Sequence, residues 1–405
     1  MRLILAVHYN WPIHQLDVSN AFLHGHLEEE VFMEQPQGFE DPTHPELVCK
    51  LHKSLYGLKQ APRAWFLCLS QALLELGFVG SSVDTSLFCF HCDSVSIFLL
   101  VYVDDIIVTS NTPAAIGALI SQLKCEFALK DLGDLSFFLG IQAHRNSHGL
   151  HLHQGKYVTD LLIRVKMAGA KPVPTPCVSG SKLSKFQGDP LSDPKEYRHI
   201  VGAFQYCTLT RPDIAYSVNQ LCQFLHSPTS VHLTAAKRLL RYLKGTLHYG
   251  LYYTQGSLKL NGFCDSDWAG SPDDRKSTTC YAIYLGSCLI SWAAKKQPTI
   301  ARSSMEAEYR SMALTMAELY WIRMLLKEIR LFLCSAPCLW VDNIGALSLS
   351  PLILSFMLAL NTSKWIITLF ERKCLIRIWL LAIYQLQISP QIFLQKVSHQ
   401  PVSYY

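Results

Sequence analysis

Apolar and polar positions in the first third of the chain alternate in short runs that predict strands separated by helices. Residues 13–18 form an apolar strand, and the apolar run before them is typical of the last turns of a core helix. Residues 95–101 and 106–108 are two aliphatic, β-branched runs around a polar pair. This pattern predicts a tight hairpin that exposes carboxylates at its tip. Helical spacing of apolar residues appears at 64–76 and 112–127.

The rest of the chain follows two further patterns. Residues 171–194 are rich in Pro, Ser, Gly and Lys, which indicates a linker or surface loop. Beyond them the spacing predicts helices at 197–209, 212–225 and 232–244, strands at 260–264, 280–285 and 288–293, a helix at 304–329, a strand at 337–341 and a helix from 343. We therefore predict units at 1–150, 151–256 and 257–350, and a separate tail at 351–405.

Composition limits the possibilities without deciding among them. A chain of 405 residues is too long for one ordinary core and predicts two or three domains. Its 36 Lys and Arg against 31 Asp and Glu give a net charge of +5, which permits nucleic-acid binding but does not establish it. Fourteen cysteines without framework spacing suit a reducing compartment. Cys89, His91 and Cys92 are spaced like metal ligands, but no second pair is nearby, so we expect no zinc.

Three aspartates carry the candidate chemistry. Nucleotidyl transfer needs two divalent metal ions that clamp the attacking and leaving oxygens, and hard Mg²⁺ prefers carboxylate ligands. Asp17 ends one predicted strand, while Asp104 and Asp105 stand at the predicted hairpin tip. Placing those strands side by side would bring the carboxylates together. An Asp-Asp pair alone is weak evidence, because turns favour Asp for local hydrogen bonding.

Longer motifs surround these aspartates and strengthen the interpretation. They are QLDVSNAFLHG at 15–25, SLYGLKQAPRAW at 54–65, YVDD at 102–105, KDLGDL at 130–135 and FLGI at 138–141. In this order they resemble the copia-type reverse transcriptases of retrotransposons, and the resemblance covers roughly residues 1–350. It implies an α+β polymerase palm of the right-hand type, followed by a connection or thumb-like helical region and an RNase H-like α/β domain.

The resemblance implies a metal-binding role for the aspartates and further roles nearby. Asp17, Asp104 and Asp105 look like the palm's ligands for two Mg²⁺ or Mn²⁺ ions in the active site. Phe22 has the position that excludes a ribose 2′-hydroxyl in this family, and an ordinary core aromatic is the alternative. The implied partners are an RNA template, a DNA primer, RNA–DNA hybrid and dNTPs.

A second segment resembles the family's contact with incoming nucleotide and template. It contains Lys59, Gln60 and Arg63. The alternative interpretation is a capped helix start whose charges are solvated.

The second half of the motif set resembles the family's RNase H. It comprises FCDSDWAG at 263–270, DDRKST at 273–278, SSMEAEYR at 303–310 and WVDN at 340–343. The resemblance implies Asp265, Glu308 and Asp342 as metal ligands that serve cleavage of the RNA strand of a hybrid. Glu308 is preferred to Glu306 because it falls where the family's helix points inward, and Asp265 is preferred to Asp267.

Two weaker features leave alternatives open. The basic residues of the predicted helix at 232–244 are at near-helical spacing and could follow a phosphate backbone, or could form a solvated face; they are Lys237, Arg238, Arg241 and Lys244. A non-catalytic nucleic-acid-binding protein is therefore an alternative function.

Residues 343–363 are uncharged and of membrane-spanning length, but they contain Asn, Gly, Pro and several Ser, so we expect no membrane association. We expect an intracellular location, in a cytoplasmic virus-like particle or the nucleus; the sequence does not indicate an oligomeric state.

Both ends depart from the family pattern. The chain begins inside the helix before Asp17, so we expect most of the fingers to be missing. Residues 351–405 contain one acid against five bases and no clear period. One permitted back-translation of residues 353–369, read one base earlier, spells NPVFHARTKHIEVDYHF, which resembles the family's RNase H continuation. We interpret the tail as a shifted reading frame that removes a fourth RNase H carboxylate, and expect a degenerate or inactive enzyme.

Overall fold

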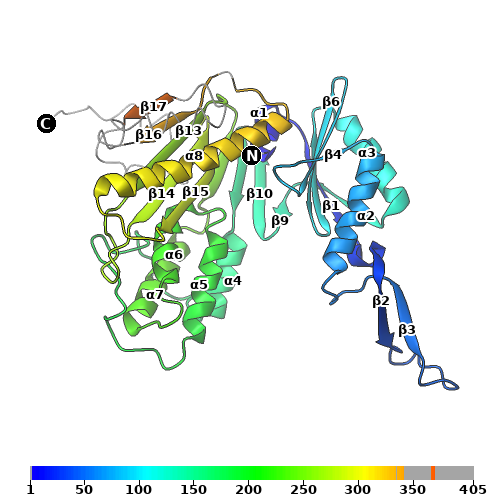
Figure 1. The fold of residues 1–405 in the computed structure, drawn as a ribbon, viewed down its shortest axis with the longest axis horizontal. Coiled ribbons are helices and arrows are strands. Elements are labelled where there is room, and N and C mark those ends of the chain that lie inside the picture. Colours follow the sequence, from blue (N-terminus) through cyan, green and yellow to red (C-terminus); the bar gives the residue numbers. More distant parts are fainter. Residues whose placement is uncertain (1, 334, 342–365, 370–405) are drawn as a thin grey trace. The chain divides into compact units, whose positions relative to one another are not determined.

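The computed structural model describes residues 2–333, 335–341 and 366–369, which form two compact units. The first comprises Arg2–Phe138 and the second comprises the residues from Leu139 onward. Each combines helices with largely antiparallel sheet (Figure 1). The units are described separately below, and the boundaries predicted near residues 150 and 256 stay predictions.

The first unit is built on a six-stranded sheet with the order β4-β5-β6-β7-β1-β8. The strands of this sheet are β1 (Ile13–Val18), β4 (Val79–Gly80), β5 (Leu87–Cys92), β6 (Val95–Tyr102), β7 (Asp105–Ser110) and β8 (Leu129–Asp134). The helices of the unit are α1 (Arg2–His8), η1 (Ala21–His24), α2 (Ala61–Glu75) and α3 (Pro113–Glu126). A short strand outside this sheet, β9 (Phe137–Phe138), is the last element of the unit. The strand predicted at 13–18 and the hairpin predicted around YVDD are confirmed. Figure 1 shows α2 and α3 covering one face of this sheet.

The core of the first unit lies between that sheet face and the two helices. Leu16, Leu73, Leu99 and Ile106 are fully buried, and Trp65 is 1% exposed. Burial of each such side chain contributes roughly 1.5–3 kcal/mol. This packing fixes β1 and β7, the strands that carry the candidate aspartates.

The hairpin of β2 (His26–Glu34) and β3 (Val48–Lys53) was not predicted. Its strands pair antiparallel with an irregular register, and their residues are mostly exposed. Leu27, Val31 and Met33 are half-buried on one face of β2, but Glu29 interrupts their alternation, so the sequence HLEEEVFME does not show a clear strand period. Figure 1 shows this hairpin projecting from its unit.

The second unit begins with strands and helices that surround a helical core. They are β10 (Ile141–Asn146), β11 (Gly149–His153), α4 (Gly155–Arg164), α5 (Lys195–Cys207), η2 (Pro212–Ile214), α6 (Ala215–Cys222), α7 (Ser230–Gly245) and β12 (Gly250–Thr254). The three helices predicted between 197 and 244 are confirmed, whereas β11, α4 and β12 were missed. β11 pairs with both β10 and β12, so one sheet joins segments on either side of the helices.

A buried ion pair ties η2 to the end of α7. The Arg211 guanidinium, 1% exposed, donates from Nε and Nη2 to the two Asp213 carboxylate oxygens at 2.9 and 2.7 Å. It also donates to Thr246 O at 2.9 Å, and Tyr242 donates its hydroxyl proton to Asp213 Oδ2 at 2.8 Å. Charges can be buried here because the hydrogen bonds compensate their desolvation.

The C-terminal part of the second unit is a five-stranded sheet with the order β15-β14-β13-β16-β17. Its strands are β13 (Leu260–Ser266), β14 (Thr278–Leu285), β15 (Cys288–Lys296), β16 (Cys338–Val341) and β17 (Ile366–Leu369), and α8 (Ser304–Glu328) packs on β13 and β14. β13, β14 and β15 are antiparallel, whereas β16 and β17 run parallel to β13 and β16 respectively. The strands and long helix predicted for 260–341 are confirmed, and the helix predicted from residue 343 lies outside the described residues.

No helix within the described ranges is long and apolar enough to span a membrane. The uncharged stretch at 343–363 lies outside those ranges.

Four histidines gather on the sheet of β10, β11 and β12. The rings of His144 and His153 stack with centroids 5.1 Å apart, those of His151 and His153 lie 5.0 Å apart, and His248 meets His153 at 6.4 Å. Burial lowers the pKa of His151 to about 4, and the three neighbouring histidines lower it further in the same direction. Burial also lowers the pKa of His153. The folded unit therefore favours the neutral forms of His151 and His153.

This cluster predicts acid sensitivity of the fold. Since the unfolded chain binds protons at an ordinary His pKa of about 6.5 and folded His151 only near 4, stability should fall as the pH drops between these values. Thermal unfolding from pH 7.5 to 4 should show a shallower decline for His151→Gln than for the unchanged chain. His148→Gln, at the exposed turn of the same hairpin, is the control; equal slopes for all three proteins would contradict the prediction.

Candidate active site

The turn between β6 and β7 exposes the candidate aspartates at its tip. Tyr102 pairs with Asp105, so Val103 and Asp104 are the two turn residues. Val103 has a φ of 56°, a left-handed conformation that a β-branched side chain rarely adopts. Two-residue hairpin turns with a positive φ at this position usually have Gly there. The strain persists because the surrounding structure holds the turn.

Two contacts hold this turn in place. The indole Nε1 of Trp65, on α2, donates a hydrogen bond to Val103 O at 2.6 Å. The backbone N–H of Val18 donates to Asp104 O at 2.9 Å. The register of β1 on β7 puts Asp17 directly opposite Asp105, a position at which Cα atoms are roughly 4.5–5.5 Å apart. The sequence-predicted triad is thus on adjacent strands of one sheet.

The electrostatics of the triad are those of crowded carboxylates. Burial raises the pKa of Asp105, and the Asp104 and Asp17 charges raise it further, while a hydrogen bond from Gln15 opposes both effects. Gln15 Nε2 donates to Asp105 Oδ1 at 3.3 Å. A divalent cation would relieve this repulsion, and three carboxylates are the hard oxygen donors that Mg²⁺ prefers. No group of three His, Cys, Asp or Glu side chains is already arranged to hold a metal in the part of the chain that the structure describes.

The other residues predicted for this site lie in η1 and at the start of α2. Phe22 lies in η1, packs against the core beside α2 and has its ring centroid 4.7 Å from that of Tyr56. Gln60 is the residue before α2, and Lys59 and Arg63 beside it are exposed. The structure therefore leaves both interpretations of each residue open.

A second carboxylate pair forms where β13 meets α8. The backbone N–H of Ser266 donates to Asp265 Oδ1 at 2.6 Å and to Glu308 Oε1 at 3.1 Å. Both carboxylates are buried, at 5% and 6% exposure. Ser311, one turn further along α8, donates its hydroxyl proton to Asp265 O at 2.8 Å. Asp342, predicted as the third member, lies outside the described residues.

The neighbouring acids have different surroundings. Glu306 is half-buried and forms an ion pair with Arg310, one turn further along α8, at 2.5 Å. Asp267 accepts a hydrogen bond from the Thr278 backbone N–H, and burial raises its pKa. Glu308 rather than Glu306 therefore stands beside Asp265.

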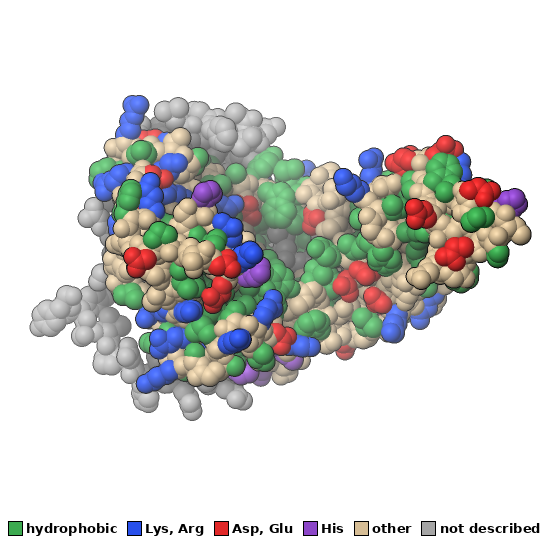
Figure 2. All heavy atoms as spheres, turned by 90° about the horizontal axis from the view of Figure 1, so that it is seen from below, with side chains coloured by type: hydrophobic (Ala, Val, Ile, Leu, Met, Phe, Trp, Pro, Cys, Tyr) green, Lys and Arg blue, Asp and Glu red, His purple; other side chains and the backbone are tan. Residues whose placement is uncertain are grey.

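The basic residues of α7 contact a neighbouring segment of the chain. Arg238 Nη2 donates to Thr175 Oγ1 at 2.7 Å, and Arg241 Nε donates to Lys171 O at 2.6 Å. Lys244 Nζ donates to Ala170 O at 2.8 Å, and Lys237 is exposed. Figure 2 views this end of the second unit, where Lys and Arg are interspersed with Asp and Glu rather than forming one continuous patch. The nucleic-acid role of α7 stays a prediction.

Comparisons with known proteins agree on the family. Residues 1–179 match the model for reverse transcriptase (RNA-dependent DNA polymerase). The chain is 51% identical over 349 residues to the retrovirus-related Pol polyprotein from transposon RE1 of Arabidopsis thaliana, covering 85% of this chain and 24% of that protein. It is also 33% identical over 308 residues to a putative transposon Ty5-1 protein of Saccharomyces cerevisiae, covering 75% of this chain and 100% of that one. The chain belongs to the copia-type retrotransposon Pol family.

Other relatives extend this result to further plant elements. The chain is 39% identical over 339 residues to the retrovirus-related Pol polyprotein from transposon TNT 1-94 of Nicotiana tabacum, covering 81% of this chain and 26% of that protein. It thus spans about a quarter of the length of the Pol polyproteins that it matches. The reverse transcriptase domain has a palm-type fold, and it comprises the unit that carries Asp17, Asp104 and Asp105.

The sequence analysis missed two residues that support the palm aspartates. Trp65 and Gln15 both stand inside the recognised motifs, but nothing in their spacing predicts a contact with a turn about 40 or 90 residues away. Only the packing of α2 against the sheet, and the pairing of β1 with β7, creates these hydrogen bonds.

Replacement of Trp65 tests how far this side chain holds the turn. Trp65→Phe keeps a buried ring but leaves Val103 O without its indole donor, so the free energy of unfolding should fall by about 1–3 kcal/mol. Chemical denaturation measures the change. Trp321→Phe, at a side chain that is 41% exposed on α8, is the control and should cost less than about 0.5 kcal/mol; similar losses for both would argue against a special role of Trp65.

Proposed function

We propose that the chain is an RNA-directed DNA polymerase with an attached RNase H, and that the palm aspartates bind its metal ions. The observation that carries the proposal is the register that sets Asp17 opposite Asp105, with Asp104 on the adjoining turn. Family membership supports the polymerase part.

The palm residues have distinct parts in the proposed reaction. Asp17, Asp104 and Asp105 would hold Mg²⁺ or Mn²⁺, which when bound polarises the phosphate and lowers the pKa of the attacking primer hydroxyl. Gln15 orients the Asp105 carboxylate through its amide N–H. Trp65 holds the strained turn that carries Asp104 and leads into Asp105, so the backbone of these two ligands would stay in place while their side chains adjust to the metal. Phe22 would exclude a 2′-hydroxyl, and Lys59, Gln60 and Arg63 would contact nucleotide and template.

The RNase H part of the proposal rests on the second carboxylate pair. Asp265 and Glu308 share one backbone donor, and the order β15-β14-β13-β16-β17 with α8 across it is a scaffold that brings them together. The pair would cut the RNA strand of an RNA–DNA hybrid with divalent metal. The partners would be an RNA template, a DNA primer, hybrid and dNTPs.

Primer extension tests the polymerase proposal. The full chain, supplied with an RNA template, a DNA primer, dNTPs and Mg²⁺, should extend the primer only weakly, as expected of a degenerate enzyme with a shifted tail. Asp104→Asn with Asp105→Asn should reduce that extension to background, because the amides cannot replace the charged metal ligands.

Asp93→Asn is the matched control for that double variant. Asp93 lies in the turn of the neighbouring hairpin, between β5 and β6, and has a positive φ of 50°. Asn tolerates this conformation, so extension should be unchanged. Salt-dependent binding of template–primer without extension under any metal condition would overturn the polymerase proposal and leave a non-catalytic nucleic-acid-binding protein.

We also propose that residues 351–405 arise from a shifted reading frame. The match to the RE1 protein spans 349 residues, 85% of the chain, and the composition changes after residue 350. Sequencing of the transcript should reveal a frame that continues the family sequence after a one-base change near this point. A transcript in which no one-base change restores the family sequence would contradict the proposal.

A further inference from the structure

A cavity of about 660 Å³ opens within the second unit. Its walls are the segment 176–183, which we call the strap, together with α6, α7 and Gly270. Pockets for small organic ligands usually have volumes of about 300–1,000 Å³. This one is therefore large enough for a nucleotide.

The charge of the cavity favours an anion. Its lining includes Lys182 of the strap and Lys237, Arg238 and Arg241 of α7. Among the described residues that line it there is no Asp or Glu; the nearest acid with an evident influence is Asp267, whose pKa Lys182 lowers against the stronger effect of burial. Several cations on facing walls of a cleft concentrate a positive potential within it.

Arg238 lines the cavity and has one side-chain donor that is satisfied and one that is not. Its Nη2 is held by Thr175 Oγ1 at 2.7 Å, which fixes the plane of the guanidinium. Its Nε is buried and has no hydrogen-bond partner. A buried donor without an acceptor is costly, and a phosphate oxygen would satisfy it with a charge-assisted hydrogen bond.

The rest of the lining suits an organic body attached to the anion. Val178, Leu183 and Leu221 are apolar, and Tyr216 adds an aromatic ring; aromatic side chains stack favourably on bases. Burial, reinforced by Asp267, raises the pKa of Tyr216 to about 12, so its hydroxyl stays a neutral hydrogen-bond donor. A bare inorganic ion would leave this apolar surface unused.

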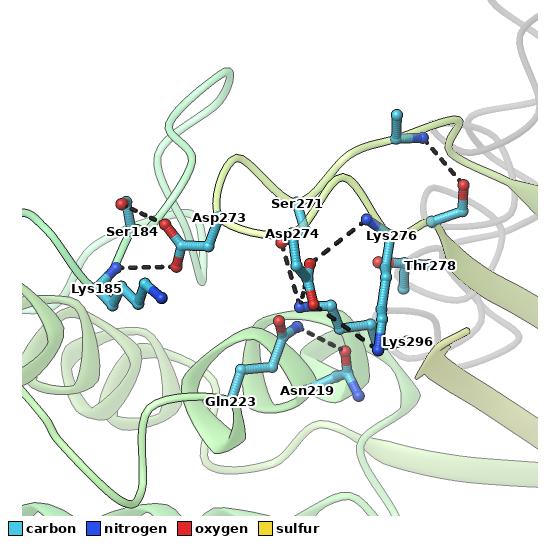
Figure 3. A network of polar contacts seen from close by, with 12 residues as sticks. Ser184, Lys185, Asn219, Gln223, Ser271, Asp273, Asp274, Lys276, Thr278 and Lys296 are labelled. Carbon is cyan, nitrogen blue, oxygen red and sulfur yellow. Dashed lines mark hydrogen bonds and ion pairs between the residues drawn. The ribbon is translucent and has the colours of Figure 1, made fainter. Parts of the chain in front are cut away.

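The strap is fastened to the rest of the unit rather than left as a loose loop. Just beyond it, Ser184 Oγ and the Lys185 backbone N–H donate to the two carboxylate oxygens of Asp273 at 2.5 and 2.9 Å (Figure 3). Asp274, which follows Asp273 in the sequence, forms an ion pair with Lys296 of β15 at 2.8 Å (Figure 3). The cavity wall is thus anchored to the C-terminal sheet.

Gly270 lines the cavity and also lies against Asp267, the acid that follows β13 of the C-terminal sheet. A Cβ at Gly270 would approach Asp267 Oδ2 to 1.9 Å, so the lining of the cavity and that carboxylate are in direct contact. Asp267 follows Asp265 by two residues.

We propose that this cavity binds a nucleoside phosphate, with the phosphate at Lys182, Lys237 and Arg238 and the nucleoside against Tyr216 and the apolar wall. The phosphate can belong to a free nucleotide or to the 5′ end of a strand. The proposal does not require polymerase activity, since none of these residues lies in the unit that carries Asp104 and Asp105.

Calorimetric titration of the full chain tests the cavity, with AMP, adenosine and inorganic phosphate as probes. AMP should bind at least about tenfold more tightly than either part alone, because only AMP uses both the cations and the apolar wall. Lys182→Gln with Lys237→Gln should weaken AMP binding by about tenfold or more and leave adenosine unaffected.

Lys195→Gln, an exposed lysine at the start of α5 outside the cavity, is the matched control and should bind AMP like the unchanged chain. Both altered lysines of the double variant are exposed, and unchanged thermal unfolding would verify that it folds. Equal affinity for AMP and adenosine, or equal loss in the control, would overturn the proposal.

Competition between AMP and oligothymidylate distinguishes the two sources of the phosphate. A 5′-phosphorylated strand that displaces AMP better than its 5′-hydroxyl counterpart identifies a strand end; displacement by neither identifies a free nucleotide. AMP binding retained by Asp104→Asn with Asp105→Asn, in a chain that extends no primer, would uphold the cavity while the polymerase proposal failed.

Discussion

The pairing of β1 with β7 is the constraint on which the candidate polymerase site depends. Side chains alternate between the faces of a sheet, so a slip of one residue would turn Asp17 away from Asp105. The register is held by burial: Leu16 stands opposite Ile106, and both are fully buried. Apolar packing on one face of the sheet thereby decides where carboxylates meet at its end.

The rest of the first unit counteracts the cost of that arrangement. Burial, and to a smaller extent the Asp104 and Asp17 charges, raise the pKa of Asp105, and Val103 adds a strained backbone. Neither is favourable in isolation. The indole of Trp65, itself rigid within the core, supplies the donor that keeps the turn in place. Repulsion is thus concentrated where metal binding would offset it, the strain of Val103 is borne by the packed turn, and stability comes from buried residues elsewhere in the unit.

In the second unit, cations have two different structural situations. Arg211 is buried, and Asp213 and Thr246 satisfy its guanidinium, so its charge serves the fold. Arg238 and Arg241 also contact the chain, yet they line a cavity whose described walls contain no acid. The sequence does not distinguish a buried, paired arginine from one that lines a cavity, because local spacing shows which face a residue is on but not what covers that face.

The sequence by itself determined the family, the strands that carry Asp17 and Asp105, the long helix that carries Glu308 and the succession of strands and helix along residues 260–341; it missed β17. These follow from local motifs and apolar periodicity, which depend on residues close together in the chain. It did not determine the mostly exposed β2–β3 hairpin, in which Glu29 interrupts the apolar face of β2, or β12, which pairs with β11 about a hundred residues earlier. The tertiary structure alone decided that Trp65 supports Val103, that Ser266 joins Asp265 to Glu308, and that the strap closes a cationic cavity over α7. Each of these depends on packing between distant segments, and local pattern carries no information about which distant segment will be the partner.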